Sequence, residues 1–196
     1  MAWLEEVLMR LTCRPCVGYR ADGPAAVEPT ALAALALAAH GRHEAARPAL
    51  EWLARLQSPD GTLGITATLR QPHWPTGWAL LAWSVVGGGE WLRGAIDRAA
   101  AWLLAFKGRP VPPSPQIGHD TTLQAWPWVD GTHSWVEPTA MNLLALKASG
   151  MGRHARSRDA VRLLCDRAVP AGGWNYGSRE VLGRAVAPHV QPTGLA

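Results

Sequence analysis

Apolar and polar positions alternate along the chain in blocks that predict two kinds of helix. The segments 28–39, 77–86 and 138–149 are apolar at most positions. A helix that is apolar on every face is expected to be buried on all sides. The segment 44–57 instead carries one apolar stripe, Ala46, Leu50, Leu53 and Leu56, at helical spacing with charged residues elsewhere.

Two further segments, 91–106 and 156–168, follow the second and third apolar blocks and are predicted to be helices. In the latter we expect a buried stripe made of Val161, Leu164, Cys165 and Ala168. A short helix over residues 3–12 precedes the whole series. The chain is therefore predicted to be all-α, with buried inner helices and amphipathic outer helices in turn.

A Pro-Thr pair opens each apolar block, at Pro29-Thr30, Pro75-Thr76, Pro138-Thr139 and Pro192-Thr193. Proline is favoured at the first helical position, where its missing N–H would be unpaired in any case. Recurrence of one junction indicates an internal repeat. We expect helical hairpin repeats that form an α/α-toroid, or an open arc of one, as a single domain over 1–196.

The predicted arc is incomplete, because the chain supplies about three and a half hairpins. It begins on an outer helix and its last residues lie within an inner one. An inner apolar face would then be exposed. We therefore expect further sequence or another chain to close the ring.

The loop 108–132 is long and rich in proline, and loops of this length are often functional. It carries His119 and Asp120, and His133 follows it directly. A histidine beside a carboxylate can act as an acid or a base near neutral pH. His119, Asp120 and His133 are therefore candidate catalytic residues.

Five tryptophans lie at the starts of apolar blocks, where the mouth of a toroid cavity is expected: Trp126, Trp128 and Trp135 on the loop before 138–149, and Trp74 and Trp78 around Pro75. Aromatic faces in such a cavity could bind an isoprenoid or stabilise a carbocation. The alternative is that these rings fill gaps between hairpins.

Glu28 and Glu137 occupy equivalent places, each directly before a helix-opening proline. Glutamate is a poor N-cap residue, so its recurrence needs a reason. One explanation is attraction to the positive end of the helix dipole. The other is a pair of carboxylates that face one cavity, as in glycoside hydrolysis.

The net charge is +4, and almost all of the positively charged residues are arginines. The only dense basic run comprises Arg153, His154, Arg156 and Arg158, without the interleaved aromatic residues that stack on bases. Such a run is usually a solvated helix face. We predict no nucleic-acid partner.

The first eleven residues contain Glu5, Glu6 and Arg10 where a signal peptide requires an unbroken apolar core. No apolar run approaches the roughly 20 residues that a membrane-spanning helix requires. We expect a cytoplasmic protein without a transmembrane segment. Peripheral membrane contact through an exposed apolar patch remains an alternative.

The three cysteines, Cys13, Cys16 and Cys165, do not form a complete metal site in the sequence. Cys13 and Cys16 have the Cys-x-x-Cys spacing, but no second pair or His-x-x-x-His motif supplies the other two ligands. We predict reduced thiols, with no metal and no cofactor.

Two segments resemble the repeat of a known superfamily. Trp52-Leu53, Gln57 and Gly61-Thr62-Leu63 follow an aromatic-Leu…Gln…Gly-x-Trp pattern, with Leu63 in place of tryptophan, and Gly172-Gly173-Trp174 matches the turn. The chain thus resembles the terpenoid cyclase and prenyltransferase superfamily, particularly squalene–hopene cyclase-like proteins with prenyltransferase/squalene oxidase repeats. The resemblance implies an α/α-toroid whose aromatic-lined cavity binds an apolar, isoprenoid-like ligand.

The catalytic signatures of that superfamily are missing here. No two aspartates lie within three residues of each other, so the Asp-x-Asp-Asp acid cluster is absent, and no cysteine stands in the Asp/Cys/His zinc context. We therefore do not expect a competent cyclase from this chain alone and leave open whether it is an enzyme. Two alternatives are a non-catalytic scaffold for a protein partner and a carbohydrate-active barrel enzyme using Glu28 and Glu137.

Overall fold

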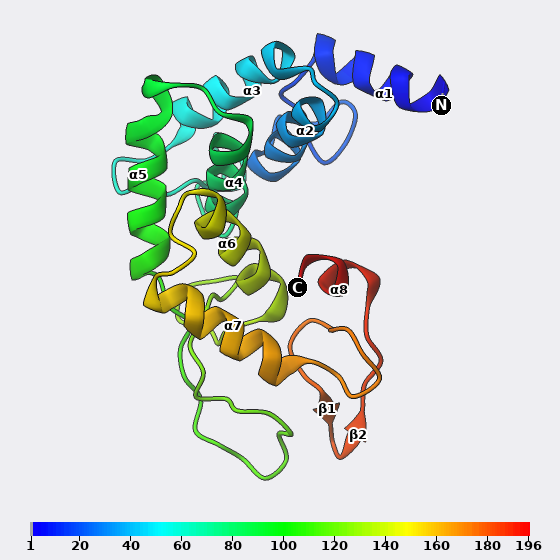
Figure 1. Ribbon diagram of the computed structural model, residues 1–196, viewed down its shortest axis with the longest axis vertical. Coiled ribbons are helices and arrows are strands. Elements are labelled where there is room, and N and C mark those ends of the chain that lie inside the picture. Colours follow the sequence, from blue (N-terminus) through cyan, green and yellow to red (C-terminus); the bar gives the residue numbers. More distant parts are fainter. Residues whose placement is uncertain (1) are drawn as a thin grey trace. The chain divides into compact units, whose positions relative to one another are not determined.

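The computed structural model describes residues 2–196, and these form helices joined by loops, with one very short hairpin (Figure 1). The helices are α1 (Ala2–Cys13), α2 (Val27–Ala39), α3 (His43–Leu56), α4 (Thr76–Val86), α5 (Glu90–Ala105), α6 (Val136–Ala148), α7 (Ala155–Arg167) and α8 (Val190–Leu195). The predicted all-helical class is confirmed. None of the helices within residues 2–196 has the length and apolar character needed to cross a membrane.

The hairpin was not predicted from the sequence. Strands β1 (Glu180–Val181) and β2 (Arg184–Ala185) pair antiparallel around Leu182 and Gly183, both of which have positive φ. Glycine adopts this backbone region without steric cost, and the single positive-φ leucine is confined to the turn. Two-residue strands leave too short a pattern of alternation to detect in a sequence.

The helix starts differ from the prediction in one respect. α2, α6 and α8 begin two residues before their proline, so Pro29, Pro138 and Pro192 occupy the third helical position and not the first. The first four N–H groups of a helix have no intrahelical acceptor, so proline loses no hydrogen bond at the third position either. Pro75 is the residue directly before α4.

The chain divides into two compact units, unit 1 (residues 1–102) and unit 2 (residues 103–196). In unit 1, α2 packs against both α3 and α4 (Figure 1). The indole of Trp83 is fully buried and donates through Nε1 to the carbonyl of Leu50 at 3.2 Å. Gln57, directly after α3, donates to the carbonyl of Ala95 at 2.9 Å and so links α3 to the part of α5 that belongs to unit 1.

The apolar helices of unit 1 are not buried on all sides. Leu32 of α2 is 41% exposed and Val85 of α4 is 55% exposed. An apolar pattern shows which residues can be buried, but burial also needs a packing partner on that face. The prediction of all-round burial is wrong at these two positions.

In unit 2, α6 packs against α7 and α8. The core cluster contains Val136 and Ala140 of α6 with Leu164 of α7, and partly buried Leu143, Trp174 and Leu195 lie against it. The indole of Trp174 donates to the carbonyl of Leu164 at 2.7 Å, which gives the ring a polar anchor as well as apolar contacts.

Each Pro-Thr threonine binds the backbone of a loop residue that precedes its helix. The hydroxyl oxygen accepts a hydrogen bond from the backbone N–H of that residue. This N–H lies in a loop, so it has no partner within a helix or a strand. The four contacts join Thr30 to Val17, Thr76 to Leu63, Thr139 to Trp126 and Thr193 to Trp174, with N···O distances of 3.1, 2.9, 3.3 and 2.9 Å.

Candidate functional site

A pocket of about 410 Å³ lies in unit 2, between the loop that joins α5 to α6 and the segment that carries the β1–β2 hairpin. Its apolar lining comes from Val111, Ile117, Leu123, Val181 and Leu182. Polar groups on its wall belong to Gln116, His119, Thr121, His133, Ser134, Arg167, Ser178 and Glu180. The volume lies within the range of about 300–1,000 Å³ that is usual for small-molecule sites.

Two contacts hold the walls of this pocket together. The long loop folds back on itself where Val111 N–H donates to the carbonyl of Thr121 at 3.0 Å and the Thr121 hydroxyl donates to that of Val111 at 2.7 Å. The side chain of Arg179, directly before β1, donates from Nε to the carbonyl of Gly118 at 3.1 Å. The loop and the hairpin segment are therefore joined beside the pocket.

Arg167, in the last turn of α7, is the charged side chain most deeply buried in the pocket wall, with 4% of its surface exposed. Its NH1 group donates to the backbone carbonyl of Asp120 at 3.1 Å and pairs with the Asp166 carboxylate. Its Nε is buried and has no hydrogen-bond partner among residues 2–196. The Nε edge of the guanidinium group is therefore enclosed by protein, with almost no accessible surface.

The structure brings the two predicted histidines, His119 and His133, to the same pocket. Burial, followed by the positive charge of Arg167, lowers the pKa of His119 to about 4 and also lowers the pKa of His133. The Nδ1 atom of His119 is buried without a hydrogen-bond partner in the described chain. At neutral pH His119 is therefore an uncharged imidazole, and one of its ring nitrogens is buried without a hydrogen bond.

Asp120 does not act as the partner of His119 in this structure. Its carboxylate accepts the N–H and the hydroxyl of Thr122 at 2.8 and 2.6 Å, and these bonds lower the pKa of Asp120. Across residues 2–196 no hydrogen bond joins this carboxylate to His119. The predicted catalytic role of His119, Asp120 and His133 stays a prediction, and the neighbouring pair does not form the expected dyad.

The five predicted ligand-binding tryptophans do not line the pocket. Trp126 is fully buried, donates from Nε1 to the carbonyl of Leu103 at 3.0 Å, and is covered by the guanidinium of Arg156 at 4.5 Å from its ring centroid. Trp135, Trp128, Trp74 and Trp78 are partly buried. The wall is aliphatic and imidazole-rich, unlike the aromatic lining that the resemblance implied.

Trp135 contacts a pocket residue. Its ring lies 4.5 Å, centroid to centroid, from that of His133. A side chain at Gly177 would come within 2.9 Å of the same indole, so that close approach requires glycine. Trp74 and Trp78 belong to unit 1, where they flank the start of α4.

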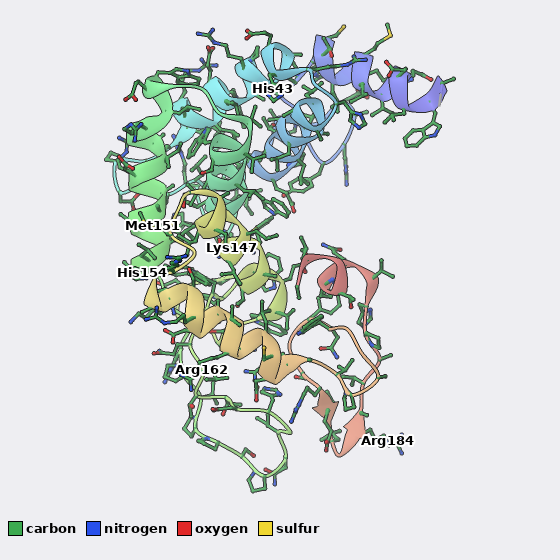
Figure 2. All side chains as sticks on the ribbon, in the orientation of Figure 1. His43, Lys147, Met151, His154, Arg162 and Arg184 are labelled. Atoms are coloured by element: carbon green, nitrogen blue, oxygen red, sulfur yellow. The ribbon has the colours of Figure 1, made fainter. Side chains whose placement is uncertain are left out.

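The basic run at the start of α7 is not a uniformly solvated face. Arg156 turns inward and donates to the carbonyls of Gln124, Phe106 and Ala125 at 2.8, 3.0 and 3.1 Å. Arg153, His154 and Arg158 are exposed, and Figure 2 shows His154 at the start of α7. The prediction of a solvated run is therefore wrong for Arg156.

The buried stripe of α7 also differs from the predicted one. It contains Arg156, Ser157, Ala160, Leu163, Leu164 and Arg167, whereas Val161 and Cys165 are exposed. The buried face of α7 differs from the predicted one because its two buried arginines bind loop carbonyls. A pattern of apolar residues cannot reveal such contacts. Arg167 was missed for this reason, and the hairpin residues of the pocket were missed because two-residue strands leave too short an alternation to detect. The sequence signal that could have identified Arg167 is its helical spacing, three residues after Leu164, which places it on the same face of the helix.

Glu28 and Glu137 lie in different units, and each has a polar partner within its own unit. Glu28 accepts the Tyr19 hydroxyl at 2.8 Å, and burial together with this bond raises the pKa of Tyr19. Glu137 is buried and accepts the amide of Gln191. Their role as a catalytic carboxylate pair stays a prediction.

Among residues 2–196, no three histidine, cysteine, aspartate or glutamate side chains are grouped so that they could hold a metal ion. Cys13, Cys16 and Cys165 are free thiols. Burial raises the pKa of Cys16, against the opposing influence of Arg55. A thiol with a raised pKa is a weaker nucleophile and metal ligand at neutral pH.

A scan against protein-family models and a search of curated proteins both found no match for the chain. Its class therefore rests on its own fold and site. It is a helical protein with a pocket of ligand size in its second unit.

Proposed function

We propose that the chain is an α/α hairpin-repeat protein, similar to the terpenoid cyclase/prenyltransferase superfamily, that binds an apolar, isoprenoid-like molecule in the unit 2 pocket. The observation that carries the proposal is the pocket itself. Five aliphatic side chains and eight polar residues line it. A concave site of this volume that combines apolar surface with hydrogen-bonding groups suits a small molecule.

Recurring backbone contacts support the repeat architecture. The first N–H of α2, from Val27, donates to the carbonyl of Ile65 at 2.9 Å. The first N–H of α6, from Val136, donates to the carbonyl of Tyr176 at 3.0 Å. Ile65 and Tyr176 each lie two residues after a loop residue that a Pro-Thr threonine binds. The same combination of backbone and threonine contacts thus occurs in both units, and this recurrence supports the proposed repeat.

The state of the histidines favours binding over cyclase chemistry. Protonation of an alkene needs a strong acid that is held in its protonated form. His119 is uncharged at neutral pH, because burial and Arg167 lower its pKa to about 4. A neutral imidazole suits hydrogen bonding to a ligand better than protonation of a hydrocarbon.

One observation agrees with the scaffold alternative and another opposes it. A scaffold is expected to pack its tryptophans against protein, as Trp126 does. It is also expected to lack an apolar pocket of ligand size, and unit 2 has one. The pocket therefore favours ligand binding as the proposed function.

The test is calorimetric titration of the whole chain with geraniol, a neutral isoprenoid alcohol, at neutral pH. We expect saturable binding with one site. The variant Leu123→Glu places a charge on the aliphatic wall and should weaken binding by about tenfold or more. The matched control is Val129→Glu, on the same loop but outside the pocket, which should bind as the natural chain does.

Two results would refute the proposal. One is the absence of saturable binding by the natural chain. The other is equal weakening of binding by Leu123→Glu and Val129→Glu, because the effect would then not depend on the pocket.

A further inference from the structure

The loop between α5 and α6 begins with a proline-rich segment, residues 109–115 (Figure 1). Its sequence is Arg-Pro-Val-Pro-Pro-Ser-Pro, so each of its residues either is a proline or directly precedes one. Proline fixes φ near −65°, and the residue before a proline is restricted to extended or polyproline II backbone. No helix or strand of the described chain includes these residues. The segment therefore favours the polyproline II conformation.

Three side chains of this segment share one edge. A polyproline II helix has three residues per turn, so residues three apart lie above one another. Arg109, Pro112 and Pro115 have this spacing, and all three are exposed. The guanidinium group of Arg109 makes no hydrogen bond or ion pair within residues 2–196. The edge thus offers a positive charge followed by two proline rings.

Hydrogen bonds to the rest of the loop hold the segment in place. The N–H of Arg109 donates to the carbonyl of Thr132 at 2.8 Å, and the N–H of Val111 donates to the carbonyl of Thr121 at 3.0 Å. The Thr121 hydroxyl donates to the Val111 carbonyl at 2.7 Å. A segment that is already ordered loses less conformational entropy on binding than a flexible one. These contacts therefore prepare the segment for recognition by another molecule.

We propose that residues 109–115 are a docking motif for a polyproline-binding groove on a partner protein. Grooves of this kind, as in SH3 domains, are lined by aromatic side chains against which proline-rich segments dock. Pro112 and Pro115 lie in the groove. Arg109 pairs with a carboxylate at the end of the groove, because a planar guanidinium group binds a carboxylate through two parallel hydrogen bonds. This inference goes beyond the proposed function and does not depend on a ligand in the pocket.

The test is calorimetric titration of the whole chain with a set of purified SH3 domains that carry a carboxylate at the end of the aromatic groove. We expect saturable one-to-one binding. Arg109→Glu should weaken it by about tenfold or more, because a charge-assisted pair is replaced by repulsion. Pro112→Ala should also weaken it by about tenfold, because a ring that fills the groove is lost and the free segment becomes less rigid.

The matched controls are Pro110→Ala, in the same segment but off the shared edge, and Arg153→Glu, at an exposed position elsewhere in unit 2. Both should bind nearly as the natural chain does. The first controls for the loss of a proline and the second for the change of charge. Circular dichroism checks that each variant is folded.

A second measurement assigns the charge contact. The same titration uses an SH3 domain whose groove carboxylate is replaced by the amide. This domain should bind the natural chain more weakly and should no longer discriminate between the natural chain and Arg109→Glu.

Two results would overturn the inference. One is the absence of saturable binding between the natural chain and every SH3 domain of the set. The other is equal weakening by the edge substitutions and by their controls, because binding would then not follow the shared edge. Neither result bears on the proposed function, which the geraniol titration tests separately.

Discussion

Arg156 shows how one buried charge can order a loop that has little regular structure. Its guanidinium group donates to three loop carbonyls and covers the ring of Trp126 at 4.5 Å. Hydrogen bonds from a charged donor contribute about 1.5–3 kcal/mol each. The side chain thus stabilises the segment from which one wall of the pocket is built.

Replacement of this side chain should destabilise unit 2. We expect Arg156→Met to lower the free energy of unfolding by at least about 2 kcal/mol, because three loop carbonyls, two part-buried and one buried, lose a charged donor. The control, Arg158→Met, removes an exposed arginine from the same helix turn and should change stability by less than about 0.5 kcal/mol. Urea unfolding followed by circular dichroism measures both. Equal effects would contradict the structural role of Arg156.

His119 should make stability depend on pH. Its pKa is about 4 in the folded chain, against about 6.5 for an unperturbed histidine. Between these values the unfolded chain binds more protons than the folded one, so this group lowers stability as pH falls from about 6.5 to 4. Burial also lowers the pKa of His133, which acts in the same direction.

The variant His119→Phe should therefore flatten the pH dependence of the free energy of unfolding in this window. Urea titrations of the natural chain and the variant at several pH values give the two curves. Parallel curves between pH 4 and 6.5 would show that His119 is not held neutral by its surroundings.

At the scale of the elements, the helices follow from the sequence because each is encoded locally. Dense apolar blocks and a Pro-Thr junction predict α2, α4 and α6 to within about two residues. The pocket is not encoded in this way. It depends on Arg167 and on the hairpin around Leu182, which meet the long loop through tertiary contacts alone. His119 and His133 were found because titratable residues on a long loop are a recognisable signal.

The tryptophans illustrate the same difference between local pattern and tertiary role. Their places before the helices could be read from the sequence, but not the direction in which each ring points. The nitrogen of Trp126 meets a carbonyl of α5, and that of Trp174 meets a carbonyl of α7. Through these contacts the two rings join α5 and α7 to loops.

The contribution of the Pro-Thr junction to stability can be tested by substitution of its threonine. Thr76 is fully buried and accepts the N–H of Leu63 at 2.9 Å. Thr76→Val preserves the shape but leaves that N–H without an acceptor, so we expect a loss of about 1–3 kcal/mol in the free energy of unfolding. Thr68→Val, at an exposed position of the same unit, is the control and should be nearly neutral.

Thermal or urea unfolding measures both valine variants. An equally small effect at Thr76 and Thr68 would show that the hydroxyl contact does not stabilise the junction. The same substitution at Thr139, which is also fully buried, should give a loss of similar size in unit 2.

At the scale of the whole molecule, the chain divides into two compact units with different features. Unit 1 has a core built from α2, α3 and α4. Unit 2 carries the long loop, the hairpin and the pocket. A ligand that binds in the pocket should therefore act on unit 2 and leave the local stability of unit 1 unchanged.

The measurement that tests this account most directly is amide hydrogen exchange of the whole chain, with and without saturating geraniol. Local stabilisation by a ligand slows exchange where the ligand contacts the chain. The account predicts slower exchange in peptides covering residues 111–123 and 178–182, and no change in α2 and α3. Unchanged exchange throughout, or protection confined to unit 1, would contradict ligand binding in the unit 2 pocket.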